Sequence, residues 1–194
     1  MAIVIKNIEI LDRRYDLDSG DGSDSIHSNP KYSYAVTKLC TSQGLTGFGL
    51  AFTLGKGNDL VCQTILGLSD ILIGRDIEDL MSDFGRIYAQ MLEHPQYRWL
   101  GPHKGVVHLA LSSIVNACFD LWAKSRDLPL WKLLIDLSPK EILKTLHFRY
   151  IEDFLTEDEA LDMLIESKST ASERMKISGS GYPGYDTSIG WFQY

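Results

Sequence analysis

The chain has 194 residues, of which 44% are hydrophobic and 23% charged, so it is expected to form one domain or one domain with an additional segment. A net charge of −7 argues against a nucleic-acid-binding protein, which would carry a basic surface. An uninterrupted run of about 18 apolar residues is absent from the sequence, so no membrane span is expected. Cys40, Cys62 and Cys118 are too far apart for a zinc site and are expected to be buried, reduced thiols of a cytoplasmic protein.

The first part of the chain predicts a three-stranded antiparallel sheet. Ile3 to Leu11 alternates apolar and polar residues as a half-buried strand does. Tyr32 to Thr41 and Leu45 to Thr53 are two further β-prone runs, joined at Ser42-Gln43-Gly44 by a hairpin signal. Between the first two strands, Asp12 to Pro30 is polar and rich in Asp, Ser and Gly. Such a long loop is typical of a mobile lid, a binding loop or a disordered segment.

From Asn58 onward the apolar residues recur with a helical period. A first helix follows Asn58, and Asp76 is the expected N-cap of a second helix that ends at Pro95. The stretch from about Lys104 to Arg126 is apolar over most of its circumference, so it is expected to be the central and most buried helix. Strands followed by helices indicate an α+β fold: a three-stranded antiparallel meander followed by a helical bundle.

The last third of the chain contains two strong helix starts. Ser138 and Thr156 are each followed three residues later by glutamate, which predicts two capping boxes, the second opening a helix through about Glu166. Leu146 to Tyr150 is a short strand candidate. Lys168 to Gly181 is small and polar and is expected to be a flexible connection, after which Tyr182 to Tyr194 becomes rich in aromatic residues.

Two short motifs suggest ligands at first inspection. Gly55-Lys56-Gly57 lacks the spacing of a phosphate loop, so a carboxylate-binding loop or a simple tight turn remain as its two interpretations. The acids from Asp16 to Asp24 resemble a calcium loop, but the twelfth position counted from Asp16 is His27 instead of glutamate. No metal site is assigned to either segment.

A polar row follows one side of the central helix, with members spaced four residues apart: His108, Ser112, Asn116 and Asp120. A single row on one helix cannot surround a metal ion. These side chains are therefore expected to hydrogen-bond to the meander or to a neighbouring domain.

The stretch from Ala110 to Ile135 mixes small and large apolar residues and is interrupted at Asp127-Leu128-Pro129. This order resembles the capping-domain motif of the mandelate racemase and muconate lactonizing enzyme branch of the enolase superfamily. Further stretches resemble one subgroup of that branch, the L-fuconate dehydratases. They are Gly22 to Ile26, Gly47 to Asp59, Tyr97 to Ala110, Phe148 to Leu161 and Gly181 to Trp191.

The resemblance implies an enolase-type N-terminal capping domain over residues 1–150. Residues 151–194 would then hold a helix, a linker and the first segment of a (β/α)8 barrel, at whose first strand the chain is expected to be truncated. The family reaction is proton abstraction alpha to a carboxylate, with Mg²⁺ stabilising the enediolate, followed by loss of water. Its metal ligands, lysine base and His-Asp pair belong to barrel segments without a matching position here. The resemblance therefore assigns no catalytic or metal-binding residue to this chain, which is expected to bind no Mg²⁺ and to be inactive alone.

In the same family, two capping-domain loops close over the barrel and select the substrate, and they correspond to about Asp16–Tyr32 and Phe52–Asp59. By this resemblance Asp24, Lys31, Tyr32 and Lys56 are the candidates for contacting a sugar acid, with Asp24 accepting hydrogen bonds from hydroxyl groups. Related sequences more often carry an acid at the position of Lys31, which implies altered specificity.

Two functions are consistent with this sequence. One is the N-terminal part of an acid-sugar dehydratase of the L-fuconate type, which would act on a small-molecule sugar acid as a homo-oligomer. The other is a stand-alone, non-catalytic capping-domain module that binds a partner or ligand. The aromatic run from Tyr182 to Tyr194 favours the first, because an isolated module is expected to end in polar, well-capped residues.

Overall fold

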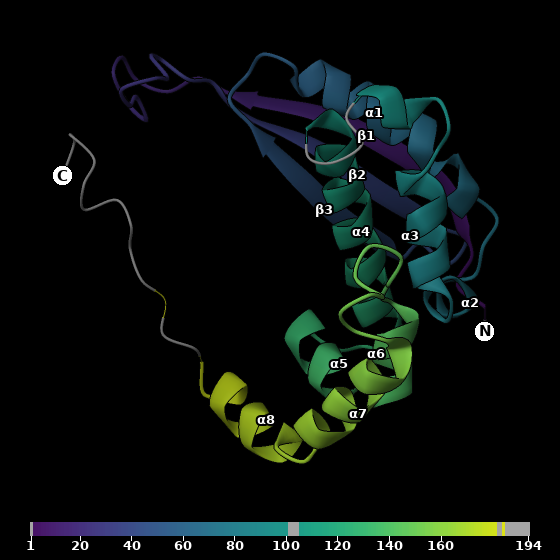
Figure 1. Ribbon diagram of the computed structural model, residues 1–194. Coiled ribbons are helices and arrows are strands. Elements are labelled where there is room, and N and C mark those ends of the chain that lie inside the picture. Colours follow the sequence, from purple (N-terminus) through teal and green to yellow (C-terminus); the bar gives the residue numbers. More distant parts are fainter. Residues whose placement is uncertain (1, 101–104, 182–183, 185–194) are drawn as a thin grey trace.

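The computed structural model describes residues 2–100, 105–181 and 184, and contains an antiparallel sheet with helices on one of its faces (Figure 1). The strands are β1 (Ile5–Tyr15), β2 (Tyr32–Thr41) and β3 (Thr46–Thr53), in the order β1-β2-β3. In the register of the sheet, Val36 of β2 lies opposite Leu11 of β1 and Leu50 of β3. The predicted meander is therefore confirmed.

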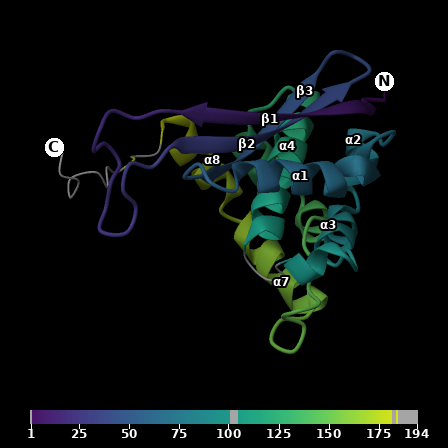
Figure 2. The same ribbon diagram turned by 90° about the horizontal axis from the view of Figure 1, so that it is seen from above.

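The helices follow the sheet in sequence, as the α+β prediction requires. They are α1 (Asn58–Ser69), α2 (Ile77–Met81), α3 (Phe84–Leu92), α4 (Val106–Ser125), α5 (Leu130–Asp136), α6 (Pro139–Lys144), α7 (Glu157–Lys168) and α8 (Ala171–Gly179), with 3-10 turns η1 (Asp70–Leu72) and η2 (Tyr97–Leu100). Viewed from above, α1, α3 and α4 lie on one side of the sheet (Figure 2). Both capping boxes, at Ser138 and at Thr156, are formed as predicted.

Helix α4 is the centre of the core and packs directly on β2 and β3. A Cβ atom at Gly47 would overlap the carbonyl oxygen of Ala117, and one at Gly49 would overlap the carbonyl oxygen of Ser113. The two glycines thus allow the helix backbone to lie against the strand. Helix α4 is long and apolar enough to cross a membrane, but its packing against the sheet and the other helices accounts for its apolarity.

The prediction that the polar row on α4 hydrogen-bonds to the meander is confirmed only in part. Asp120 accepts a hydrogen bond of 2.7 Å from the backbone amide of Phe48 in β3, so this member does bind the meander. Ser112 is exposed and instead donates to the carbonyl oxygen of Leu109 in its own helix. The buried polar contact is made by the adjacent Ser113, whose hydroxyl lies 3.1 Å from the carbonyl oxygens of Ala35 and Gly49.

Four predicted segments differ from the structure. Strand β1 extends to Tyr15, four residues past the predicted end at Leu11, because Asp12 to Tyr15 pair with β2. The single helix expected after Asp76 is two helices, α2 and α3, separated at Ser82-Asp83. Leu146–Tyr150 is not a strand, and Lys168–Gly181 is not a flexible connection, because it contains α8.

Helices α5 to α8 form an arm that leaves the sheet at the end of α4 (Figure 1). Within the arm, Lys168 joins α7 to α5: its ammonium lies 2.7, 3.0 and 2.9 Å from the carbonyl oxygens of residues 135, 136 and 137 at the end of α5. A cation at this position satisfies carbonyls that have no partner within the helix and complements its dipole. The boundary predicted after residue 150 stays a prediction, and the aromatic segment 182–194 lies outside the described residues apart from 184.

The three cysteines are free thiols, as predicted. Cys62 and Cys118 are buried, whereas Cys40 is only half-buried, which corrects the expectation for that residue. Burial raises the pKa of the Cys118 thiol to about 12, so it behaves as an apolar core residue.

Candidate functional site

Two loops lie side by side at one end of the sheet. The first loop, residues 16–31, connects β1 to β2, and the second loop, residues 54–57, connects β3 to α1. They are neighbours because Tyr15 pairs with Tyr32 and Ser33 pairs with Thr53, which brings both loops to the same end of the sheet. The backbone amide of Lys31 donates to the carbonyl oxygen of Leu54 at 3.4 Å, so the loops are also in direct contact.

Lys31 closes the neck of the first loop. Its ammonium lies 2.7 Å from the carboxylate of Asp16, at the opposite end of the loop. Its Cβ atom also limits the space at Gly55, where an added Cβ would lie 3.2 Å away. Lys31 therefore joins the two ends of the first loop and borders the second loop.

Asp24 organises a tight turn in the first loop. One carboxylate oxygen accepts hydrogen bonds from the backbone amides of Ile26 (2.8 Å) and His27 (2.6 Å), and Nδ1 of His27 lies 3.0 Å from both oxygens. The backbone amide of His27, its imidazole and the amide of Ile26 lower the pKa of Asp24 from 3.8 to about 2. The carboxylate is thus ionised at neutral pH and already accepts hydrogen bonds from groups in its own loop.

Tyr32 anchors the first loop to the sheet. Its ring packs edge-on against Phe52 with the centroids 5.1 Å apart. Its hydroxyl faces Gly22 in the first loop, where an added Cβ would lie 3.0 Å from the hydroxyl oxygen. Gly22 has a φ of 64°, so a larger residue would be opposed by both its backbone conformation and Tyr32.

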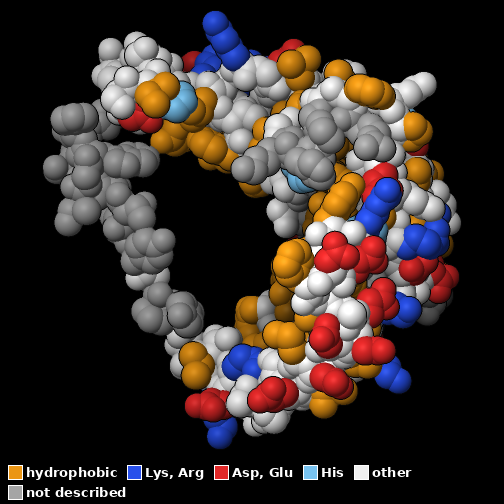
Figure 3. All heavy atoms as spheres, viewed as in Figure 1, with side chains coloured by type: hydrophobic (Ala, Val, Ile, Leu, Met, Phe, Trp, Pro, Cys, Tyr) orange, Lys and Arg blue, Asp and Glu red, His pale blue; other side chains and the backbone are white. Residues whose placement is uncertain are grey.

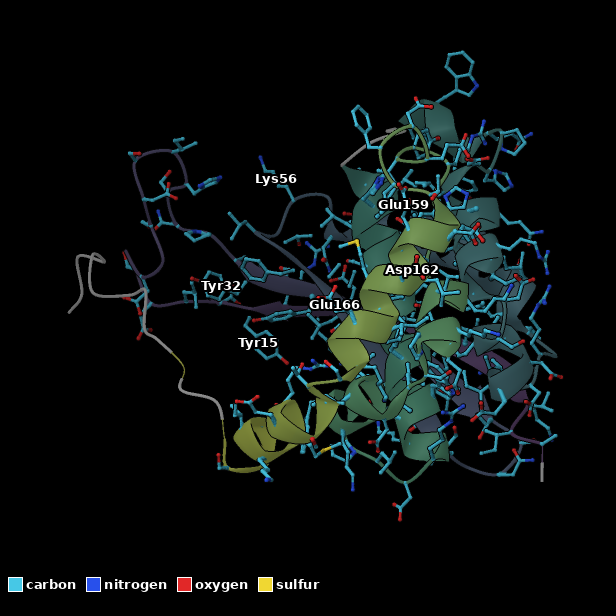
Figure 4. The ribbon with its side chains drawn as sticks, turned by 60° about the horizontal axis from the view of Figure 1, so that its bottom comes forward. Tyr15, Tyr32, Lys56, Glu159, Asp162 and Glu166 are labelled. Carbon is cyan, nitrogen blue, oxygen red and sulfur yellow. The ribbon has the colours of Figure 1, made fainter. Side chains whose placement is uncertain are left out.

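Lys56 carries the exposed ammonium group of the second loop. It is exposed and lies between Gly55 (φ 107°) and Gly57 (φ 85°), which bring the second loop to the amino terminus of α1. Its side chain extends away from Tyr15 and Tyr32 (Figure 4). A flexible ammonium beside a helix amino terminus can bind a carboxylate.

A polar network that the sequence reasoning missed holds the bases of both loops together. Asn58, buried at the start of α1, donates to the carboxylate of Asp12 in β1 at 2.7 Å and accepts from the hydroxyl of Thr53 in β3 at 2.8 Å. Arg14 binds the same carboxylate at 2.9 and 2.7 Å. The Arg14 hydrogen bonds lower the pKa of Asp12 against the opposing effect of burial, and Asn58 adds to the lowering.

The four predicted residues thus fall into two groups. Lys31 and Tyr32 are adjacent in the chain and hold the base of the first loop, whereas Asp24 and Lys56 lie on separate loops. The polarity of Asn58 next to the Gly55-Lys56-Gly57 motif was the signal that could have identified the network. The roles of Asp24, Lys31, Tyr32 and Lys56 in substrate binding stay predictions.

The described residues do not fit a Mg²⁺ ion. Among them, no group of three or more His, Cys, Asp or Glu side chains is arranged to hold a metal ion. The acids Glu159, Asp162 and Glu166 all belong to α7 (Figure 4), and one helix cannot surround an ion. No chemical step through Mg²⁺ is therefore assigned to this part of the chain.

Comparison with known proteins identifies the family of this fold. Residues 22–134, more than half of the chain, match the family described as mandelate racemase / muconate lactonizing enzyme, N-terminal domain. The chain therefore belongs to this family and is an N-terminal capping domain of the enolase superfamily.

Several relatives are substantially similar to the chain. Mitochondrial enolase superfamily member 1 of Homo sapiens is 40% identical over 194 residues, which cover 98% of this chain and 44% of that protein. L-galactonate dehydratase of Hypocrea jecorina is 39% identical over 175 residues, covering 89% of this chain and 39% of that protein. The chain thus spans less than half the length of these relatives.

Solved structures show the same architecture. The crystal structure of human mitochondrial enolase superfamily member 1 superposes with a TM-score of 0.91 and 39% identity, over 100% of this chain and 45% of that chain. A racemase from Streptomyces coelicolor A3(2) with bound magnesium superposes with a TM-score of 0.59 and 25% identity, over 70% of this chain and 36% of that chain.

Proposed function

We propose that this chain supplies the substrate-selecting lid of an acid-sugar dehydratase of the L-fuconate type. In the complete enzyme, Mg²⁺-assisted proton abstraction alpha to a carboxylate would precede loss of water, and the metal and reacting groups would come from a barrel. The 194-residue chain alone is then expected to bind no Mg²⁺ and to be catalytically inactive. The complete enzyme is expected to be a cytoplasmic homo-oligomer.

The observation that carries this proposal is the pair of loops fixed side by side by Asp12, Asn58 and Thr53. A network at the base fixes where the loops start and leaves their tips to adapt, as closure over a substrate requires. The relationship to L-galactonate dehydratase of Hypocrea jecorina supports an acid sugar as the substrate class.

The chemistry of the loops suits a polyhydroxy acid. The exposed ammonium of Lys56, beside the amino terminus of α1, would bind the carboxylate of the substrate. Asp24 remains ionised and has acceptor capacity for sugar hydroxyl groups in addition to its bonds to Ile26 and His27. Lys31 would reach a ligand only by exchanging its ion pair with Asp16.

A chimeric enzyme tests the proposal. This chain would replace the corresponding part of human mitochondrial enolase superfamily member 1, with which it superposes over its whole length. Dehydration of L-fuconate, L-galactonate and other acid sugars would be measured with Mg²⁺ present. We expect turnover by the chimera, and a KM for the acid sugar that rises roughly tenfold in Lys56→Ala, the loss of about 1.4 kcal/mol expected for one charge-assisted contact.

Lys140→Ala is the matched control, because Lys140 is also a lysine near a helix amino terminus but belongs to α6, in the arm. An unchanged KM in Lys56→Ala, with a folded and active chimera, would contradict the assigned role of the second loop. Turnover by the 194-residue chain alone would contradict the lid proposal itself. Tight binding of an acid sugar by the isolated chain without turnover would support the stand-alone binding module instead.

A further inference from the structure

Strand β3 lies at the edge of the sheet and carries no charge of its own. In the order β1-β2-β3 only β2 lies between two strands, so β3 has one side that no strand of the described residues pairs with. Its sequence, Thr-Gly-Phe-Gly-Leu-Ala-Phe-Thr, contains neither a charged residue nor proline. An uncharged edge strand is a template on which another strand can pair, and natural proteins normally block such edges. Protection of β3 therefore has to come from another part of the molecule.

Strand β1, at the opposite edge, is protected by its own residues. Its register with β2 shifts between Ile5 and Asn7. Five of its eleven residues are charged: Lys6, Glu9, Asp12, Arg13 and Arg14. Charged side chains and irregularities of this kind make an edge unsuitable for pairing with another strand. The two edges of the sheet thus differ in the protection that the strand itself provides.

Every second residue of β3 directs its backbone N–H and C=O groups away from β2. The amide of Phe48 and the carbonyl oxygen of Thr46 bind side chains of α4, so the even-numbered residues of β3 face outward. Leu50 and Phe52 follow in the same alternation. Their side chains are exposed as well, with Phe48 44%, Leu50 48% and Phe52 45% exposed. An added strand would therefore find hydrogen-bonding groups and apolar side chains on the same residues.

Two side chains of α4 occupy the outward groups at the start of β3. The carboxylate of Asp120 accepts the hydrogen bond from the Phe48 amide at 2.7 Å. The ammonium of Lys124 donates to the carbonyl oxygen of Thr46 at 3.1 Å and to Asp120 at 2.5 Å. The same ammonium lies 5.2 Å from the centroid of the Phe48 ring. Asp120 and Lys124, which we call the protecting pair, thus fill positions that a new strand would need and place two charges on an uncharged edge.

The part of the edge that remains free is short. Beyond the protecting pair, only Leu50 and Phe52 of β3 keep outward backbone groups without a partner among the described residues. Strands in globular proteins are usually about 5–6 residues long, so pairing at two residues provides few hydrogen bonds. An added strand that extended toward Thr46 would bring a carbonyl oxygen against the carboxylate of Asp120. Stable pairing is therefore opposed as long as the protecting pair is in place.

The other acidic side chains do not replace this protection. The chain has a net charge of −7, but its acids gather over the arm around α6 and α7 (Figure 3). Charges are screened over roughly 8 Å at physiological ionic strength, so acids on the arm protect β3 only weakly. The aspartates of the first loop lie beyond the opposite end of β3, where Thr53 pairs with Ser33. The charges beside Thr46 and Phe48 are those of Asp120 and Lys124.

We infer that the protecting pair keeps the edge of β3 closed to added strands, so that neither a second copy of the chain nor another extended polypeptide continues the sheet there. The arrangement is part of the fold, because the close contact of Gly49 with α4 brings the helix to this edge. Without the pair, β3 would present four consecutive outward residues, all uncharged. This inference does not depend on the enzymatic proposal, which concerns the two loops.

Removal of both charges tests the inference. In Asp120→Ala/Lys124→Met, the 194-residue chain should form aggregates that bind thioflavin T at least tenfold faster than the unchanged chain does. Asp83→Ala/Arg86→Met is the matched control, because it removes an exposed ion pair at the start of α3 and likewise leaves the net charge unchanged. Circular dichroism and urea denaturation verify that the variants are folded, and Lys124→Met alone is the milder variant if the double variant does not fold.

A further substitution in the double variant identifies the edge. Leu50→Lys should restore the slow rate of aggregation, because a lysine on an exposed edge opposes strand pairing. Leu66→Lys should not restore it: Leu66 is 50% exposed, much as Leu50 is, but it lies on α1. In the aggregates of the double variant, the amides of Leu50 and Phe52 should exchange with solvent at least tenfold more slowly than in the dissolved chain.

Aggregation of the folded double variant that Leu50→Lys suppresses and Leu66→Lys does not, with slowed exchange at Leu50 and Phe52, supports the inference. A folded double variant that aggregates no faster than the unchanged chain would overturn it. Equal suppression by the two lysines would also overturn it, as would aggregates in which the Leu50 and Phe52 amides still exchange freely, because the pairing surface would then lie elsewhere.

Discussion

Ser113 connects the central helix to two strands within the buried core. Its hydroxyl accepts a hydrogen bond from the backbone amide of Thr37 at 3.1 Å and lies 2.8 Å from the Thr37 hydroxyl. Both residues are fully buried. Because Ser113→Ala leaves these buried donors without their partner, we expect it to lower the free energy of unfolding by about 1–3 kcal/mol. Urea denaturation measures the change.

Ser112→Ala is the control for this prediction, because it makes the same chemical change one residue away on the exposed side of α4. It should change the free energy of unfolding by less than about 0.5 kcal/mol. Equal effects of the two substitutions would show that the buried hydrogen bonds of Ser113 contribute nothing beyond helix propensity.

Ser113 also shows where sequence reasoning fails for single residues. The period of four along α4 correctly marked Asp120 as a contact of the meander, but it placed Ser112 in the same polar row and overlooked Ser113. Which serine of α4 is buried is decided by the neighbouring strands, and the small residues Gly47 and Gly49 on β3 give no sign of where the helix crosses them. Local periodicity cannot supply that information.

At the scale of elements, strand β3 and helix α4 touch through their backbones. Gly49→Ala would place a methyl group on the carbonyl oxygen of Ser113 and the amide nitrogen of Ala117, and neither backbone atom can move without separating the helix from the sheet. We expect a loss of about 3 kcal/mol or more, the upper end of the range for overpacked cores. Thermal and urea denaturation measure it.

Gly179→Ala is the contrasting substitution. Gly179 lies in α8, where the nearest atom to an added Cβ is in Trp131 at 4.0 Å and the backbone needs no positive φ. It should be neutral or stabilise the helix by up to about 1 kcal/mol. A tolerated Gly49→Ala would mean that β3 and α4 are packed less closely than the structure shows.

The sequence predicted most elements correctly because their signals are local. Asp76 caps α2 through the amides of Glu78 and Asp79, and the capping boxes at Ser138 and Thr156 begin α6 and α7 as expected. The wrong predictions concern two segments in which the residue types suggest one structure and the chain forms another. The segment from Ala171 to Gly179 contains two serines but also Glu173, Arg174 and Met175, which favour a helix. Leu146 to Tyr150 is β-prone but packs on Gly85 of α3 and forms successive turns.

For the whole molecule, the arrangement of the two loops could be anticipated only in part. Family resemblance identified them as two loops of a lid. The network of Asp12, Asn58 and Thr53 joins residues up to 46 positions apart, and the open face of the sheet depends on which side of it the helices cover. Both features follow from tertiary packing, for which one sequence offers no local signal.

The packing of α7 against α5 within the arm depends on Lys168. Lys168 of α7 binds three carbonyl oxygens at the end of α5, so Lys168→Met should loosen α7 and α8 and leave the sheet and α4 unchanged. Hydrogen bonds from a charged donor contribute about 1.5–3 kcal/mol each at most, and solvent reduces this for a half-buried lysine. We therefore expect amide exchange in α7 and α8 to accelerate roughly tenfold, while that in α4 stays constant. Lys176→Met, an exposed change in α8, should alter neither, and acceleration throughout the protein after Lys168→Met would show instead that the arm and the core unfold as one unit.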